Sequence, residues 1–269
     1  MVKFNDTALQ VEGTGDATLV FLHGWPDGPA LWEGTVAHLK DQFRCVRFAL
    51  PGFGVPAVDG GSGASSLPEM TAYIARVVDA VSPQAPVILV MHDWGCVFGY
   101  AFAQQHPQRV ARMVAVDIGD YNTAAYQRTL TLRQRVGIAG YQLWLASAWG
   151  IGRLGAPRLA NRMTRWMAHR LRCPTPADTI DWSMNYPYAM QWFGLRGGLR
   201  QSRPVDPHCA VLYLYGQRKP FMFHSPAWTE RLQAQPGSAS IGLRCGHWVM
   251  LNQPEAFHAA VRRWLTAVP

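Results

Sequence analysis

The segment VILVMHDWG, residues 87–95, joins an apolar run to a stretch that suits a helix. Residues 87–91 are all apolar, and a short apolar run of this kind is typical of a buried strand. Residues 96–105 follow directly and have a helix-compatible composition. We therefore predict a strand that turns sharply into a helix. Such a turn exposes Asp93 and directs the N-terminus of the helix towards it.

Asp93 occupies the position that carries the nucleophile in turns of this type, where the residue is usually serine. A carboxylate nucleophile forms an alkyl ester, so it suits attack on a saturated carbon rather than acyl transfer. An aspartate at a strand end more often serves as a cap or turn residue, but the partners described below favour catalysis. Met91 is large for its place in such a turn, so either the turn is slightly distorted or a neighbouring small residue such as Gly99 makes room for it.

Two further motifs accompany this turn. His-Gly-Trp-Pro at residues 23–26 follows the apolar run Thr18–Leu22, and Gly-His-Trp at residues 246–248 follows another predicted strand. The chain order of turn, nucleophile, candidate acid and histidine is the order of α/β hydrolases. From about residue 15 to 265 the chain resembles the α/β-hydrolase superfamily, in the branch shared by epoxide hydrolases and haloalkane dehalogenases. The resemblance implies an α/β fold with a mostly parallel twisted sheet, flanking helices and a helical cap.

The resemblance also implies roles for residues in these motifs. The backbone amides of Trp25 and Trp94 would form an oxyanion hole for a tetrahedral ester intermediate. His23, at the start of the same loop as Trp25, is expected beside the substrate pocket. His247 would act as general base, because a neutral imidazole can remove a proton from water near pH 7.

A carboxylate should orient His247. Many relatives carry this acid after the strand that ends here at Gly216, but the loop at residues 216–220 contains none. The other family position follows the strand after the nucleophile helix, where both Asp117 and Asp120 occur. Asp117 stands directly at the strand end and is our preferred candidate, with Asp120 as the alternative.

Strand-like and helix-like runs alternate along much of the chain, which favours a parallel sheet with helices on both faces. The predicted strands are residues 18–22, 45–50, 87–91, 113–117, 210–215 and 238–244. Helices are predicted at residues 67–81 and 254–265, and the Gly/Ser-rich residues 59–66 are expected to form a loop.

Residues 122–203 interrupt this alternation and show no convincing buried strand. Their clearest helix, at residues 158–172, carries apolar residues on one face and arginines on the other. We interpret residues 122–203 as a helical cap inserted into a hydrolase core formed by residues 1–121 and 204–269.

Tyrosines in the cap bear on the leaving group, because in epoxide hydrolases two cap tyrosines donate to the epoxide oxygen. Tyr141, in the run GYQLW, resembles the first of them. In the run MNYPY, Tyr186 and Tyr188 compete for the second role, and Tyr186 is favoured. Aromatic residues in a cap also commonly serve in packing alone.

A haloalkane dehalogenase would instead need N–H donors for a halide. Trp94 and the cap residue Trp144 are candidate donors, whereas position 25 carries Trp in place of the Asn often found in that family. Phe221 lies in the loop that replaces the missing acid loop and is expected to line the pocket.

The composition suits one large domain or a core with a cap, with 49% hydrophobic residues in a chain of 269. The chain has no long uninterrupted apolar run and no apolar signal region near its N-terminus, so we expect no transmembrane helix and a cytoplasmic location. Five widely spaced cysteines are expected to be free thiols. The sequence shows no metal-ligand cluster, and no cofactor is expected.

Positive charge is concentrated in the predicted cap. Residues 121–205 contain twelve Arg, two Asp and neither Lys nor Glu, a net charge of +10, whereas the whole chain carries +8. No nucleic-acid motif accompanies this charge, so no nucleic-acid partner is expected. A solvated arginine-rich surface is the simplest interpretation, and weak contact with an anionic membrane surface is an alternative. Nothing in the sequence assigns an oligomeric state.

The main hypothesis is therefore an epoxide hydrolase that acts on a small apolar epoxide. A haloalkane dehalogenase with the same Asp93 and His247 is the first alternative, and release of chloride or bromide would reveal it. A hydrolase-fold binding protein without turnover is the second, which Met91 and the missing loop acid keep open.

Overall fold

The protein, seen here in a computed structural model, is described over residues 2–4, 7–53 and 66–267. Its eight-stranded sheet has the order β1-β2-β4-β3-β5-β6-β7-β8. The pairs β1–β2 and β2–β4 are antiparallel, and every other pair is parallel. The strands are β1 (Val2–Phe4), β2 (Thr7–Glu12), β3 (Thr18–Leu22), β4 (Arg44–Arg47), β5 (Val87–His92), β6 (Val110–Val116), β7 (Ala210–Gly216) and β8 (Ala239–Leu243).

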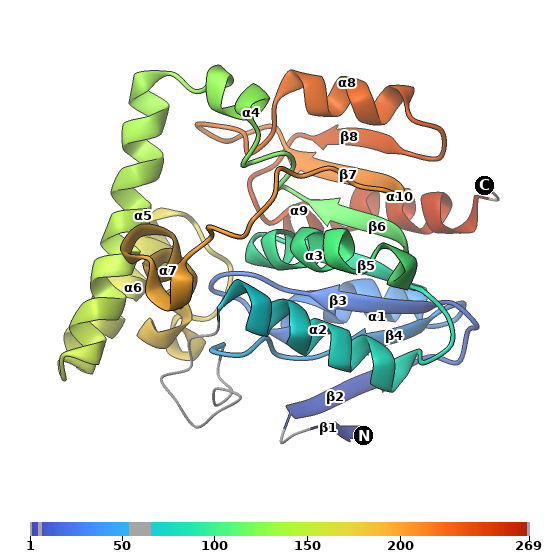
Figure 1. Cartoon of the computed structure of the whole chain (residues 1–269), viewed down its shortest axis with the longest axis horizontal. Helices are drawn as coiled ribbons and strands as arrows, with labels where there is room; N and C mark the ends of the chain where they lie inside the picture. The colour runs from blue at the N-terminus through green and yellow to red at the C-terminus, as the bar shows by residue number, and fades with distance from the viewer. Residues whose placement is uncertain (1, 5–6, 54–65, 268–269) are drawn as a thin grey trace.

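Helices cover both faces of the sheet (Figure 1). On one face lie α2 (Leu67–Val81), α3 (Trp94–Gln105) and α8 (Pro226–Ala234); on the other lie α1 (Glu33–Leu39), α9 (Val249–Asn252) and α10 (Pro254–Thr266). The strands in between supply apolar side chains to both layers, as in sheets buried on both sides. In β5, Leu89 and Met91 pack with the first set of helices, whereas Ile88 and Val90 pack with the second.

The predicted α/β architecture is confirmed, with some shifted boundaries. The strand expected at residues 45–50 is β4, which ends at Arg47, and the strand expected at residues 113–117 is β6, which begins at Val110. Strands β1 and β2 were not predicted. Residues 59–65 of the expected loop lie outside the described residues, and Ser66 caps the N-terminus of α2.

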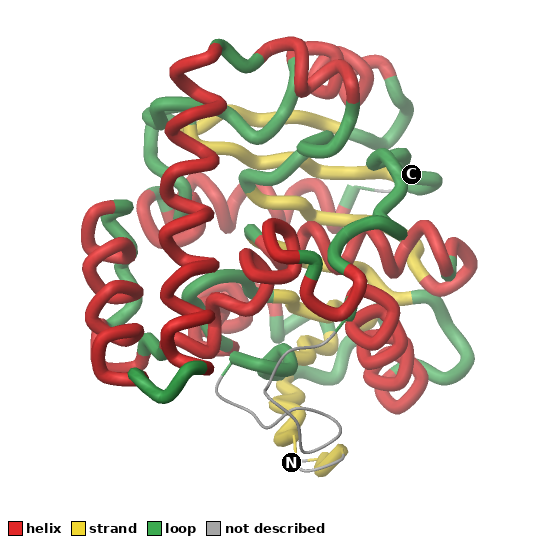
Figure 2. The backbone as a smooth tube through the Cα atoms, turned by 60° about the vertical axis from the view of Figure 1, so that its left-hand side comes forward, coloured by secondary structure: helices red, strands yellow, loops and turns green. Residues whose placement is uncertain are grey.

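Between β6 and β7 the chain forms helices and loops without a strand from residue 122 to 203, and we call this part the helical insertion. Its helices are α4 (Ala124–Thr129), α5 (Leu132–Arg153), α6 (Pro157–Arg170) and α7 (Tyr186–Phe193). Helices α5, α6 and α7 lie together beyond the carboxyl ends of the parallel strands, with the long helix α5 alongside α6 and α7 (Figures 1 and 2). In the described part of the chain, no helix combines the length and apolar character needed to cross a membrane.

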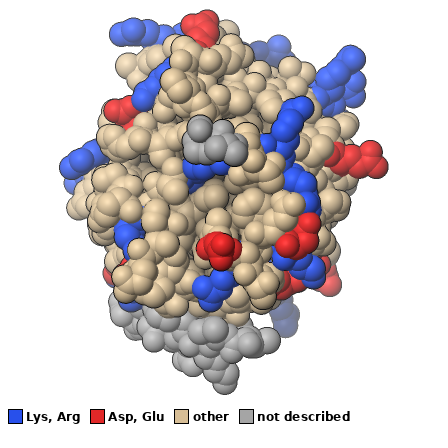
Figure 3. Space-filling view, turned by 90° about the vertical axis from the view of Figure 1, so that its right-hand side faces the viewer, with Lys and Arg blue, Asp and Glu red and all other residues tan. Residues whose placement is uncertain are grey.

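The surface on the opposite side of the molecule has no concentration of one charge. Figure 3 looks at the side away from the helical insertion and shows basic and acidic side chains interspersed there. The arginines of the insertion therefore set it apart from this surface, in agreement with its net charge of +10 in the sequence.

The crossing of β5 and α3 is tight, and glycines make it possible. A Cβ atom on Gly99 would overlap the buried Met91 Sδ and lie 3.1 Å from Leu22 Cδ1. A Cβ on Gly95 would lie 2.6 Å from the backbone oxygen of His23. Gly99 therefore provides the space that the large side chain of Met91 occupies, which is one of the two alternatives that the sequence left open.

Replacing Gly99 with Ala should lower the free energy of unfolding by about 1–3 kcal/mol, because the added methyl group overpacks against Met91. In the double variant Gly99→Ala/Met91→Ala, the space left by the shortened side chain at position 91 should accept the methyl group added at position 99. Urea denaturation of the two single variants, the double variant and the wild type gives the coupling, expected to be at least about 0.5 kcal/mol in the stabilising direction. If the two substitutions change the free energy of unfolding additively, the proposed contact between positions 91 and 99 is wrong.

Candidate active site

Asp93 lies at the turn from β5 into α3, as the sequence predicts. Its backbone has φ 52° and ψ −124°, a conformation that L-residues rarely adopt and that costs on the order of 1–3 kcal/mol. The Trp25 backbone N–H donates to Asp93 Oδ1 over 2.8 Å. A Cβ atom on Gly24 would lie 2.5 Å from Asp93 Oδ1 and 2.6 Å from the Trp94 backbone nitrogen. Glycine at position 24 therefore leaves space for Asp93 Oδ1 next to the backbone amides of Trp25 and Trp94. An oxyanion hole would need donors at this place.

His247 and Asp117 meet Asp93 from two other loops. His247 Nε2 lies 3.4 Å from Asp93 Oδ2, and His247 Nδ1 lies 2.5 Å from Asp117 Oδ2. Asp117 follows β6 and His247 follows β8, so parallel strands bring three residues distant in sequence to one edge of the sheet. This arrangement suits a nucleophile, a base and an acid that orients the base.

Asp120 has a different environment from Asp117. Its carboxylate accepts hydrogen bonds from the Ser225 amide (2.7 Å), the Ser225 hydroxyl (2.7 Å) and the Thr123 hydroxyl (2.7 Å). It therefore ties the start of α8 to the loop after β6. Of the two candidate acids, only Asp117 contacts His247 in the described residues.

The electrostatics of the site favour an ion pair between His247 and Asp93. Burial alone would lower the pKa of His247, but Asp117 and Asp93 outweigh burial and raise it to about 9. Burial opposes ionisation of Asp93, yet the hydrogen bond and charge of His247 hold the pKa of Asp93 below its usual value. Both shifts favour the charged forms, an imidazolium between two carboxylates.

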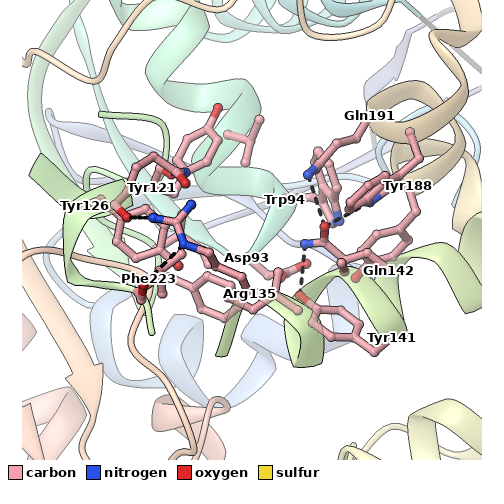
Figure 4. Close-up of a pocket in the computed structure, with 17 residues that line it drawn as sticks. Asp93, Trp94, Tyr121, Tyr126, Arg135, Tyr141, Gln142, Tyr188, Gln191 and Phe223 are labelled. Atoms are coloured by element: carbon pink, nitrogen blue, oxygen red, sulfur yellow. Dashed lines mark hydrogen bonds between the residues drawn. The ribbon is translucent and has the colours of Figure 1, made fainter. Parts of the chain in front are cut away.

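A cavity of about 350 Å³ opens next to Asp93, between the strand ends and the helical insertion (Figure 4). Aromatic side chains line much of it, among them Trp94, Tyr141, Tyr188 and Phe223. Tyr141 comes from α5 and Tyr188 from α7, so the insertion supplies the part of the wall that lies across from the sheet.

Both of these tyrosine oxygens accept a hydrogen bond from a neighbour. Gln142 Nε2 donates to the Tyr141 hydroxyl over 3.2 Å, as Figure 4 shows, and the Trp94 side chain donates to the Tyr188 hydroxyl. Gln142 is itself held, because its Oε1 accepts from Gln191 Nε2 and Trp192 Nε1 at 3.0 Å each. A phenol has one hydrogen, so each tyrosine keeps its O–H free to donate into the cavity.

Tyr186, favoured from the sequence as the second cap tyrosine, does not line this cavity. It is fully buried and packs its ring edge-on against Phe53 at 5.7 Å between centroids. Pro187 starts α7 between the two tyrosines, and the helix turns Tyr188 rather than Tyr186 towards Asp93. Tyr188 therefore replaces Tyr186 as the candidate donor.

Three residues expected at the pocket do not line it. His23 is buried, and its Nε2 accepts from the Leu50 amide over 3.0 Å, so it fixes the loop that carries Trp25. Trp144 donates its indole N–H to the Met163 carbonyl on the outer side of α5. The ring of Phe221 stacks on that of Tyr141 without lining the cavity, and Phe223 lines the cavity instead.

The sequence did not single out several buried polar groups around the site. Lys219 Nζ lies 2.5 Å from Asp117 Oδ2. Asp27, two residues after Trp25, accepts hydrogen bonds from Trp248 Nε1 (3.0 Å) and Thr175, which joins the oxyanion loop to the histidine loop and to the insertion. Burial raises the pKa of Asp27 to about 6 against the effect of these hydrogen bonds. The only available signal for Asp27 was its place directly after the His-Gly-Trp-Pro motif.

The cysteines are free thiols, as expected. Across residues 2–4, 7–53 and 66–267, no group of three or more His, Cys, Asp or Glu side chains is placed to hold a metal ion.

Comparison with known proteins agrees with this fold. A model of the alpha/beta hydrolase family matches residues 19–260, so the chain belongs to that family. A haloalkane dehalogenase from Mycolicibacterium smegmatis is 36% identical over 108 residues, which are 39% of this chain and 34% of that protein. Epoxide hydrolase 1 from Caenorhabditis elegans is 27% identical over 120 residues, 44% of this chain and 30% of that protein. These matches span about a third of the length of each curated relative.

A solved structure extends the likeness to the whole chain. A variant of an epoxide hydrolase from Bacillus megaterium, crystallised with a diol product, has a TM-score of 0.73 and covers 97% of each chain at 17% identity. At this identity the likeness establishes the fold. Together, the matches place the chain in the alpha/beta hydrolase family, among relatives that are named as epoxide hydrolases and as a haloalkane dehalogenase.

Replacing His247 with Gln should change how stability depends on pH. The pKa of His247 is raised from 6.5 to about 9 in the folded protein, so its contribution is complete below pH 6.5 and is lost as the pH rises through 9. The difference in unfolding free energy between wild type and His247→Gln should therefore shrink between pH 6.5 and 9. Urea denaturation across this range measures it, and parallel curves would contradict the ion pair.

Proposed function

We propose that the protein is an epoxide hydrolase that converts a small apolar epoxide into a vicinal diol through a covalent ester of Asp93. The observation that carries this proposal is the pair Tyr141 and Tyr188 beside Asp93, each with its oxygen held by a donor and its O–H free. An epoxide needs a proton donor for its oxygen as the ring opens. In this proposal the helical insertion acts as the cap that supplies both donors.

In the first step Asp93 Oδ2 attacks an epoxide carbon, and the carbon–oxygen bond of the ring breaks. The oxygen takes a proton from Tyr141 or Tyr188. Burial raises the pKa of both tyrosines, so a phenolate is unfavourable and regains a proton from the His247 imidazolium through water. The products of this step are a neutral hydroxyalkyl ester and a neutral imidazole.

In the second step neutral His247 removes a proton from water, and the oxygen of that water attacks the ester carbonyl of Asp93. The amides of Trp25 and Trp94 stabilise the tetrahedral oxyanion. Its collapse breaks the ester bond, and the departing diol oxygen takes the proton of the hydroxyl that water added. The Asp93 carboxylate is thereby restored, beside the His247 imidazolium that formed when water lost its proton. The net reaction is epoxide plus water to diol, so the protons balance without a cofactor.

Dehalogenation by the same Asp93 remains the alternative, and the haloalkane dehalogenase relative favours it. A halide would need free N–H donors, but the two tryptophans in the cavity wall already have acceptors. Trp94 donates to Tyr188, and Trp192 donates to Gln142 over 3.0 Å. This pairing supports the epoxide over the halide, and parallel assays of both substrate classes separate the two.

The ester intermediate should accumulate when His247 is replaced by Gln. The variant keeps Asp93 and the tyrosines, so ring opening can still proceed, more slowly, with water in place of the imidazolium as the source of the proton that restores the phenol. Activation of water for attack on the ester is lost. After mixing with a panel of terminal and aryl epoxides, mass spectrometry of the intact protein should show one added substrate mass. A digest of the same sample should place that mass on the peptide carrying Asp93. The matched variant Asp93→Asn should show no adduct. Absence of any adduct in His247→Gln, with no turnover by wild type, would favour a binding protein.

The two tyrosines of α7 should differ in their effect on ring opening. Tyr188→Phe should slow ester formation by about 100-fold, because it removes one donor to the epoxide oxygen. Tyr186→Phe removes a hydroxyl that does not face the cavity and should leave the rate close to that of wild type. Single-turnover kinetics of both variants measure this difference, and the reverse order would return the role to Tyr186.

A further inference from the structure

The acid Asp117 serves two cationic partners at once. Its Oδ2 lies 2.5 Å from His247 Nδ1 and also 2.5 Å from Lys219 Nζ, while its Oδ1 accepts the Gly216 amide over 2.9 Å. The Asp117 side chain is fully buried, and that of Lys219 is only 7% exposed. A lysine is seldom buried to this extent unless it is paired. An acid that only orients a histidine does not need this second cation.

The position of Lys219 after β7 and its contact with Phe223 place its ammonium group at Asp117. Lys219 follows β7, the neighbour of β6 in the sheet, and its ammonium group lies 5.7 Å from the centre of the Phe223 ring. Within the described residues, its one ion pair is that with Asp117. Arg218, the preceding residue, is exposed and makes no ion pair there.

We propose, on the basis of the function above, that Lys219 is a positioning residue that shares the Asp117 carboxylate with His247 and so frees the imidazole to act as a base once Asp93 is esterified. Asp117 alone would hold the imidazolium in place. Lys219 supplies the positive charge that Asp117 needs when the imidazole becomes neutral.

A count of buried charges explains the effect. Along the direct contacts that run from Asp93 through His247 and Asp117 to Lys219, two carboxylates balance two cations in the resting site. Esterification makes Asp93 neutral, so the imidazolium becomes a surplus charge beside the pair of Asp117 and Lys219. An uncompensated buried charge is costly. The imidazolium therefore gives up its proton in the ring-opening step, to the tyrosine that has protonated the epoxide oxygen. The resulting neutral imidazole is ready to take a proton from water.

The other ionisable groups around His247 do not replace Lys219. His92, from β5, has its ring centre 4.4 Å from that of His247, and burial together with the charge of His247 lowers the pKa of His92 to about 3, so it stays neutral. Asp27, from the loop after β3, is engaged by Trp248 and Thr175. The charged groups facing His247 directly are then those of Asp93 and Asp117, with Lys219 behind Asp117.

The test is Lys219→Met, which keeps an unbranched chain as far as the ε position and removes the charged ammonium group. Single-turnover reactions, quenched and analysed by mass spectrometry, give separate rates for formation and hydrolysis of the Asp93 ester across a range of pH. The rate of ester hydrolysis falls as the pH is lowered, because His247 becomes protonated. In Lys219→Met this fall should occur at a pH about one unit higher than in wild type, because the imidazolium beside Asp117 is no longer opposed by a second cation. The rate of ester formation should not fall.

The control is Arg218→Met. It also removes one positive charge, but at the neighbouring residue, which is exposed. Its pH profile should superimpose on that of wild type. Lys219→Arg, which restores a cation, should return the profile towards wild type. If Lys219→Met does not fold, Lys219→Gln takes its place in the same measurement.

A second readout does not depend on turnover. The NMR titration of His247 in the free protein should move to higher pH by about one unit in Lys219→Met and should not move in Arg218→Met. An unchanged titration and an unchanged hydrolysis profile would overturn the role of Lys219. Failure of wild type to form any ester would count against the proposed function, while the titration would still decide on Lys219.

Discussion

The backbone of Asp93, with φ 52° and ψ −124°, is the constraint on which the site depends. The conformation is strained, and the packing around it keeps it in place. Gly24 and Gly95 allow the chain to approach the turn closely, and Gly99 gives Met91 its space. The same turn places the Asp93 carboxylate at the Trp25 amide and within reach of His247. A larger residue at position 24 would overlap the Asp93 carboxylate itself, and one at position 95 would overlap the backbone that leads to the Trp25 amide.

Charge balance is the second constraint. A single imidazole between two buried carboxylates favours the imidazolium, which is the wrong form for a base but the right form for supplying a proton. Ring opening of an epoxide consumes a proton, whereas loss of a halide does not. The site therefore matches a reaction in which esterification of Asp93 converts His247 from a proton source into a base. Lys219 fits this scheme because it keeps Asp117 compensated in both forms.

Much of this site could be predicted from the sequence because parallel strands end at one edge of the sheet. A residue just after a predicted strand is therefore close to others in the same position, which is how Asp93, Asp117 and His247 could be grouped. The antiparallel strands β1 and β2 could not be predicted, since β2 pairs with β4, which is distant in sequence, and β1 pairs with β2.

Side-chain direction within the helical insertion was beyond the sequence. Whether Tyr186 or Tyr188 faces the cavity depends on the rotation of α7 against α5, which tertiary contacts set. Lys219 was also missed as a partner of Asp117, because a lysine next to an arginine and a proline in a loop normally indicates an exposed position. Its burial follows from the neighbouring positions of β6 and β7 in the sheet.

Isotope labelling in a single turnover tests the central claim most directly. Wild-type protein in excess over an epoxide that it converts would react in water enriched in oxygen-18, and both the diol and the peptide carrying Asp93 would be analysed by mass spectrometry. The ester mechanism predicts a diol without label and one labelled oxygen in the Asp93 carboxylate. A labelled diol with an unlabelled peptide would mean that water attacks the epoxide directly and would contradict the account.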